Sequence, residues 1–343
     1  MRSSISNSEP VYTSIPGRRD LKTIRFATIV LIASVLAVTL LAEIASRYAF
    51  PRISHIESRI RGDERQVAAI GSSGAASPSV MLLVGNSLLL DGLDYPKIQS
   101  EMASDAKVVR FVIENTEFLD WYYGLQHLFA SGVRPSTVVV CLNLGQTVSS
   151  RTLGDYSSRH LFGISQLLPL AHDAGMDATR TSSLVLAHWS SFYANRATIR
   201  NFILNRTAPG YAAAMHGIVD NLKETLPPEQ ELVDKARKRI RAMQQLCHQY
   251  GVQLIILVPP SLGQNDDLLV SAAKLEQTNV DDPLPFGSLG PESFRADRFH
   301  LNERGAAVFT EALARSLRAR LASNGRTEGL PHRIRGSEIN GLR

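Results

Sequence analysis

Residues 80–87 read Val-Met-Leu-Leu-Val-Gly-Asn-Ser, an apolar run followed by a short polar turn. A continuous apolar run, without alternation of polar and apolar positions, predicts a strand that is covered on both faces. Gly85 and Asn86 interrupt the run, and Ser87 is the first hydroxyl beyond it. We therefore expect a buried parallel strand that ends close to a serine.

Three further apolar runs have the same character, and they cover Val108–Ile113, Thr137–Leu142 and Val252–Val258. Helical patterns lie between them and after them, over Glu117–Phe129, from Pro227 to Gly251, and from about Glu303 onward. This alternation predicts an α/β fold, a three-layer sandwich with a mostly parallel sheet. Sites in such sheets form beyond the carboxyl ends of the strands, and Ser87 has that position.

The remaining segments are arranged around a folded domain that we place at residues 79–322. Residues 49–78 contain Pro51, mixed charges and a Gly/Ser-rich stretch, and they predict a stalk or linker. Residues from about 145 to 226 exceed the length of a simple crossover and predict a helical insertion that shapes the substrate site. Residues 323–343 are polar and basic, and they predict a disordered tail.

The N-terminal region contains an apolar segment. Phe26–Ala42 carries no charge, and this run of about 17 residues becomes long enough to cross a bilayer if it extends to Tyr48. Basic residues precede it, which predicts a cytoplasmic segment at residues 1–25, a transmembrane helix at 26–48 and a domain on the extracytoplasmic, periplasmic side of a bacterial cytoplasmic membrane. A cleaved signal peptide is the alternative, but Glu43 and Leu40 stand where small residues would precede the cleavage site.

Composition and charge exclude some classes of function. The chain has 343 residues, 44% of them hydrophobic and 20% charged, which is typical of a globular protein. The net charge of +5 comes without an Arg/Lys stripe interleaved with aromatics, so no nucleic-acid partner is expected. Cys141 and Cys247 are expected to be small buried hydrophobes. The oligomeric state is not predicted by any of these features.

A second motif, Asp297-Arg298-Phe299-His300, directly precedes the last helical segment. A serine hydroxyl becomes a nucleophile when a neighbouring imidazole takes its proton, and a carboxylate can hold the tautomer of that imidazole. Ser87, Asp297 and His300 therefore form a candidate set for acyl transfer. Each motif alone is more typical of a helix cap or a turn, and only their joint placement favours catalysis.

At these blocks the chain resembles the SGNH (GDSL-type) hydrolase superfamily, from about Val80 to Leu321. That resemblance implies a flavodoxin-like fold in which Ser87 is the nucleophile, with Asn86 in place of the usual Asp, and Asp297 and His300 complete the triad. It also implies that the Ser87 N–H and Asn143 stabilise the oxyanion. The usual oxyanion glycine after the second strand is missing, and Asn115 is the replacement donor. No cofactor or metal is implied.

Two functions follow from this resemblance. The first is a membrane-anchored serine esterase or O-acyltransferase, whose partner is an acyl ester, with cell-envelope carbohydrate as the expected carrier, and whose anchor at 26–48 contacts the lipid bilayer. The second is a catalytically inactive binding or assembly protein with the same fold, which the missing glycine and Asn86 favour. A single-span receptor has only the anchor in its favour.

Overall fold

The computed structural model describes residues 18–71, 79–211, 227–263 and 266–328. A five-stranded sheet lies at its centre, with strand order β2-β1-β3-β4-β5 and parallel pairing throughout. This order is the flavodoxin-like one, and it confirms the predicted α/β class with a parallel sheet. The strands are β1 (Val80–Gly85), β2 (Lys107–Val112), β3 (Thr137–Cys141), β4 (Gln253–Leu257) and β5 (Asn279–Asp281). The short β5 was not predicted.

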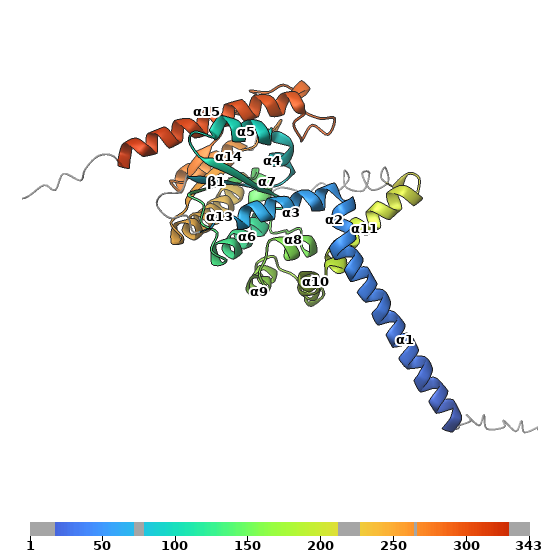
Figure 1. Cartoon of the computed structure of the whole chain (residues 1–343). Helices are drawn as coiled ribbons and strands as arrows, with labels where there is room; N and C mark the ends of the chain where they lie inside the picture. The colour runs from blue at the N-terminus through green and yellow to red at the C-terminus, as the bar shows by residue number, and fades with distance from the viewer. Residues whose placement is uncertain (1–17, 72–78, 212–226, 264–265, 329–343) are drawn as a thin grey trace, which may run out of the picture.

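Two hydrophobic cores cover the two faces of the sheet, because successive side chains of a strand point to opposite sides. Met81 and Leu83 pack into the core with α4 (Ser87–Gly92), α5 (Tyr95–Met102) and α15 (Glu303–Glu328). Leu82 and Val84 pack into the core with α6 (Phe118–Ala130), α13 (Glu229–Gln249) and α14 (Asp266–Leu275). The domain therefore has three layers, with α5 and α15 on one side of the sheet and α6 and α13 on the other (Figure 1).

The prediction of a stalk or linker at residues 49–78 is wrong for most of the residues that the structure describes there. It contains α2 (Phe50–Ile53) and α3 (His55–Ala68), and α3 packs along β2 with Ile60 and Val67 buried. Asp63 of α3 is buried beside Arg110 of β2, with 3.4 Å between the Arg110 Nε and an Asp63 oxygen. Charged residues of α3 thus find partners in the domain, and this helix is part of the folded unit. Residues 72–78 lie outside the described residues.

A long apolar helix, α1 (Arg18–Ile44), extends away from the domain and continues through the π-helical turn η1 (Ala45–Ala49) (Figure 1). Within Lys22–Ile53, an 18-residue window has a mean hydropathy of 2.4 and is 0% buried. Among the described residues this is the one helix that is long and apolar enough to cross a membrane. Both a signal anchor and a signal peptide fit that helix. Residues 1–17 of the expected cytoplasmic segment lie outside the described residues.

The predicted helical insertion contains five described helices. They are α7 (Leu144–Val148), α8 (Asp155–His160), α9 (Ile164–Asp173), α10 (Ala178–Trp189) and α11 (Ser191–Thr207), and residues 212–226 lie outside the described residues. The turn between α10 and α11 binds the end of α1. There the Glu43 carboxylate accepts hydrogen bonds from the Ser190 hydroxyl at 2.8 Å and from the N–H groups of Ser191 and Phe192 at 2.9 and 3.0 Å.

The C-terminal segment is more ordered than expected. A 3-10 turn, η2 (Pro291–Ser293), precedes the loop that leads to α15, and α15 continues through the first part of the predicted disordered tail to Glu328. The helix extends this far because no proline occurs before Pro331, and its residues are mostly compatible with a helix. Residues 329–343 of the predicted tail lie outside the described residues.

Candidate active site

The first strand delivers Ser87 to the carboxyl edge of the sheet. Gly85, the last residue of β1, pairs with Val112 of β2 on one side and with Cys141 of β3 on the other. A Cβ atom on Gly85 would lie 2.7 Å from the carbonyl oxygen of Cys141, closer than real Cβ atoms approach. Glycine therefore allows β1 and β3 to lie this close, two residues before Ser87. The site lies where the chain crosses from one side of β1 to the other, as ligand sites do in such sheets.

Asn86 fixes the turn between β1 and α4. Its side chain is fully buried, its Oδ1 accepts a hydrogen bond from the N–H of Leu88 at 3.0 Å, and its Nδ2 donates to the carbonyl of Thr116 at 2.9 Å. Asn86 is thus the N-cap of α4, and Ser87 is the first residue of that helix. The first N–H groups of a helix have no intrahelical acceptor, so the N–H of Ser87 begins the helix unpaired within it.

A hydrogen-bond network behind Asn86 was not anticipated from the sequence. The Thr116 hydroxyl donates to the carbonyl of Ile113 at 2.6 Å and accepts from the indole N–H of Trp121 at 2.9 Å. Both Thr116 and Trp121 are fully buried. The network ties the loop after β2 to α6 and holds the carbonyl that accepts from Asn86. Its only sequence signal is a polar residue shortly after a predicted strand.

The loop before α15 positions His300. The Asp297 Oδ1 accepts hydrogen bonds from the N–H groups of Phe299 and His300 at 2.9 and 3.0 Å, and Arg298, between Asp297 and Phe299, has a positive φ of 58°. The carbonyl of His300 accepts from the N–H of Arg295 at 2.7 Å. The loop thus forms a tight turn in which a single carboxylate organises the backbone that carries the histidine.

Ser87, His300 and Asp297 form one hydrogen-bonded chain. The Nε2 of His300 lies 2.9 Å from the Oγ of Ser87, and its Nδ1 lies 2.8 Å from the Oδ2 of Asp297. An ionised Asp297 only accepts, so Nδ1 carries the proton and Nε2 is free to accept the serine proton. The structure thus brings together all three residues of the candidate triad, from two segments that lie far apart in the chain.

The electrostatics of Asp297 support this tautomer. Burial raises the pKa of Asp297, but hydrogen bonds from the His300 N–H, the His300 imidazole and the Phe299 N–H outweigh burial and lower the pKa to about 2. Asp297 is therefore ionised across the physiological range. Its side chain is about half exposed (48%), while that of His300 is 21% exposed, so the imidazole reaches solvent only at its edge.

Asn143 and Asn115, the two proposed oxyanion residues, line a common cavity of about 750 Å³ together with Phe299, the neighbour of His300. Asn143 lies two residues beyond Cys141, as Ser87 lies two beyond its partner Gly85. Its Oδ1 caps α7 by accepting from the N–H of Gln146 at 2.8 Å. Asn115 is exposed with a positive φ of 59°, so a tight left-handed turn follows β2 at the place of the missing glycine.

Charged residues also line this cavity. Arg151 and Lys235 contribute positive charges, and Glu117 and Glu231 contribute negative ones. Phe299, 44% exposed, lines both this cavity and a second one of about 390 Å³ that Leu88 and Asn143 share. No role was predicted for Phe299 from the sequence, although its position inside the Asp-x-x-His motif was a usable signal. Among the described residues of the predicted insertion, the first ones, up to Arg151, line this cavity.

Comparisons with known proteins give likenesses at the level of the fold. No protein-family model matches the chain, and no curated protein matches it. Among solved structures, a GDSL-like lipase from Bacteroides thetaiotaomicron is 8% identical, with a TM-score of 0.40 over 76% of this chain and 98% of that one. An acetylxylan esterase from Geobacillus stearothermophilus is 10% identical, with a TM-score of 0.37 over 72% and 96%.

A psychrotrophic esterase from Pseudoalteromonas sp. is 9% identical, with a TM-score of 0.38 over 71% of this chain and 99% of that one. At such low identities and TM-scores these likenesses carry no argument about activity. What the chain can do chemically is read from its own site, in which a serine, a histidine and an aspartate are joined at hydrogen-bond distance.

Proposed function

We propose that this protein is a serine esterase or O-acyltransferase of SGNH type. The observation that carries the proposal is the hydrogen-bonded chain from Ser87 through His300 to Asp297, at 2.9 and 2.8 Å. The three residues come from two motifs, Gly85-Asn86-Ser87 and Asp297 to His300. These are also the motifs by which the protein resembles the superfamily. Neither a helix cap nor a turn requires the Ser87 hydroxyl to face an imidazole.

The proposed reaction proceeds in two steps. In the first, the Ser87 Oγ attacks the ester carbonyl while its proton passes to Nε2 of His300, and the leaving alcohol then takes that proton. In the second, water or an acceptor hydroxyl gives its proton to His300 and attacks the acyl-Ser87 carbonyl. The bond between the acyl carbon and the Ser87 Oγ then breaks, and Ser87 takes the proton back from His300. Asp297 keeps Nδ1 protonated and stabilises the imidazolium in both steps.

The charge that develops on the carbonyl oxygen needs hydrogen-bond donors. The Ser87 N–H at the start of α4 and the Asn143 amide are the proposed donors, and the Asn115 N–H replaces the missing glycine. Each such donor contributes about 3–4 kcal/mol to transition-state stabilisation. Replacement of Asn143 by alanine therefore tests the second donor, with an expected loss of about 10²–10³ in kcat.

The test of the proposed chemistry is reaction of the full-length protein with a fluorophosphonate probe, combined with hydrolysis of short-chain aryl esters. Ser87→Ala is expected to abolish labelling, and His300→Gln to lower the rates of labelling and hydrolysis by about 10⁴-fold or more. The matched controls are Ser104→Ala and His172→Gln, which replace exposed residues far from the site in sequence. If the wild-type protein is neither labelled nor active, the inactive binding or assembly protein is the better description.

We extend the proposal to the location and substrate. With α1 as an uncleaved anchor, the basic N-terminal segment stays in the cytoplasm and the domain faces the periplasm of a bacterium, where acyl esters of cell-envelope carbohydrate are the proposed substrates. A reporter enzyme that is active only outside the cytoplasm, fused after Arg343, tests the orientation. An inactive reporter on an intact, membrane-bound fusion protein would indicate that the domain faces the cytoplasm instead.

A further inference from the structure

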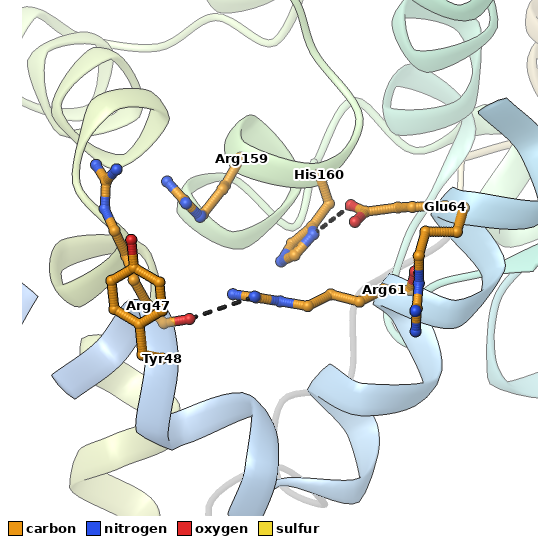
Figure 2. Close-up of a pocket in the computed structure, with 7 residues that line it drawn as sticks. Arg47, Tyr48, Arg61, Glu64, Arg159 and His160 are labelled. Carbon is orange, nitrogen blue, oxygen red and sulfur yellow. Dashed lines mark hydrogen bonds and ion pairs between the residues drawn. The ribbon is translucent and has the colours of Figure 1, made fainter. Parts of the chain in front are cut away.

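Another cavity, of about 720 Å³, lies away from the two beside Phe299, at the junction between the end of α1 and the folded domain. Arg47 and Tyr48 of η1 line one side, Arg61, Glu64 and Arg65 of α3 line another, and Arg159 and His160 of α8 close it. Figure 2 shows Arg61 reaching across the cavity toward the backbone of Arg47, with Arg159 facing them from α8. Four arginines and one glutamate line this space.

Two of these arginines contact carboxylates, and a third, Arg65, donates from its Nε to the carbonyl of Arg61 at 3.1 Å. The Nε of Arg47 contacts Glu43 at 2.5 Å, and the Nε of Arg61 contacts the buried Glu57 at 2.9 Å. Arg61 also donates to the carbonyl of Arg47 at 3.3 Å, which links α3 to η1 across the cavity. These contacts hold two guanidinium groups in place, and Glu64 is the one carboxylate among the described residues that line the cavity.

Arg159 has no such partner. Within the part of the chain that the structure describes, its guanidinium makes no hydrogen bond and no ion pair, although the side chain is partly buried. Burial and the nearby charges of Arg47 and Arg61 lower the pKa of Arg159, and they outweigh the carboxylates of Glu43 and Glu57, which raise it. A partly buried arginine that faces other arginines is destabilised by repulsion unless an anion lies between them.

His160 forms the inner wall of the cavity. Its side chain is 4% exposed, its Nδ1 lies 2.6 Å from Glu64, and its Nε2 lies 3.4 Å from Glu57 without forming a hydrogen bond. Burial lowers the pKa of His160, but the two carboxylates outweigh burial and raise the pKa to about 8. The wall is therefore a cation at neutral pH. Glu57 contacts this histidine and Arg61, and Glu64 contacts this histidine, whereas among the described residues no carboxylate forms an ion pair with Arg159.

The position of the cavity along α1 indicates where an anion would come from. The apolar part of α1 ends at Ala42, and Arg47 lies about one helical turn beyond it, the depth at which lipid headgroups meet a membrane helix. Trp189, 63% exposed, ends α10 beside the same turn, and its carbonyl accepts from Arg47 at 3.1 Å. Exposed tryptophans are typical of this interfacial depth.

We infer that the cavity lined by Arg47, Arg61, Arg65 and Arg159 binds a phosphate group, supplied by the headgroup of an anionic lipid. Arginine forks match the oxygens of a phosphate, and a basic pocket at the membrane surface is a suitable site for an anionic headgroup. The lipid source rests on α1 lying in the bilayer, as proposed above. The phosphate chemistry does not, and neither depends on catalysis at Ser87.

The experiment is a calorimetric titration of the full-length protein in neutral detergent micelles. The titrants are dioctanoyl phosphatidylglycerol, dioctanoyl phosphatidylcholine and inorganic phosphate. Phosphatidylglycerol is expected to bind, with at least about tenfold preference over the zwitterionic lipid, and Arg159→Gln is expected to weaken it about tenfold, the loss of one charge-assisted hydrogen bond. Arg159→Lys, which keeps the charge, is expected to weaken it less.

The matched control is Arg315→Gln, an exposed arginine on α15, which is expected to bind like the wild type. Melting temperatures of all variants show whether each one folds. Inorganic phosphate that binds as tightly as the lipid supports the phosphate site and assigns it a soluble ligand. Equal affinity for both lipids, or an unchanged affinity in a folded Arg159→Gln protein, overturns the proposal.

Discussion

Asn86 shows at the scale of one residue why this chain departs from the Gly-Asp-Ser pattern. Its Nδ2 donates to the carbonyl of Thr116 while its Oδ1 caps α4, so both ends of the amide are used in a fully buried position. A carboxylate could perform the capping but could not donate to the carbonyl. The substitution thus follows from the local hydrogen bonds, and it gives no support to the inactive alternative.

The corresponding prediction is that Asn86→Asp destabilises the protein by about 2–4 kcal/mol, because a buried carboxylate oxygen would face a carbonyl oxygen. The measurement is calorimetric unfolding of the full-length protein near neutral pH. Asn201→Asp, at an exposed position of α11, is the matched control and should change the stability little. Equal stability of the Asn86→Asp protein and the wild type would show that the Thr116 contact is unimportant.

His160 makes stability depend on pH. Its pKa in the folded protein is raised to about 8, so the stabilisation that its charge provides is complete below pH 6.5 and is lost as the pH rises through 8. The shift corresponds to about 2 kcal/mol. We expect the wild type to lose this stability between pH 6.5 and 9, and His160→Gln to lack that loss. Unfolding measured across this range in both proteins checks it, and parallel curves would contradict it.

At the scale of the element, α3 was missed because most of its residues are polar or charged. The residues that pack on β2 are few, and the buried carboxylates Glu57 and Asp63 look like solvent-facing residues until their partners are known. Those partners, Arg110 on β2 and Tyr156 and His160 on α8, lie far away in the sequence. By contrast, β1 to β4 were predicted because their apolar runs are continuous, and β5 was too short to be recognised.

If α3 belongs to the domain, Ile60→Ala should destabilise the protein by about 2–5 kcal/mol, since Ile60 is fully buried against β2. Ile56→Ala lies one turn earlier on the same helix at a position that is 49% exposed, and it should cost much less. Differential scanning calorimetry of both variants makes the comparison. A similarly small loss of stability in the two variants would indicate that α3 is a linker and not part of the domain.

At the scale of the whole molecule, α1 is joined to the domain through Glu43. Its carboxylate accepts three hydrogen bonds from the start of α11, where the helix dipole favours a negative charge. Glu43→Ala should therefore increase amide exchange at Ser191 and Phe192 about tenfold, as expected for the loss of charge-assisted hydrogen bonds. Hydrogen exchange read by mass spectrometry measures this. Glu311→Ala, at an exposed position of α15, is the control, and an equal increase at Ser191 and Phe192 in that variant would refute a specific joint.

From the amino-acid sequence alone we could predict the parallel α/β sheet, the apolar N-terminal helix and the candidate residues Ser87, Asp297 and His300. Continuous apolar runs and residues next to strand and helix ends are local signals. The three-dimensional arrangement was needed to show that α3 is part of the domain, that the buried Asn86 amide donates to the carbonyl of Thr116, and that four arginines line one cavity beside α1. Each of these depends on charged or polar groups meeting across long sequence separations. Burial and pairing set their energies, and neither is encoded by the spacing of residues along the chain.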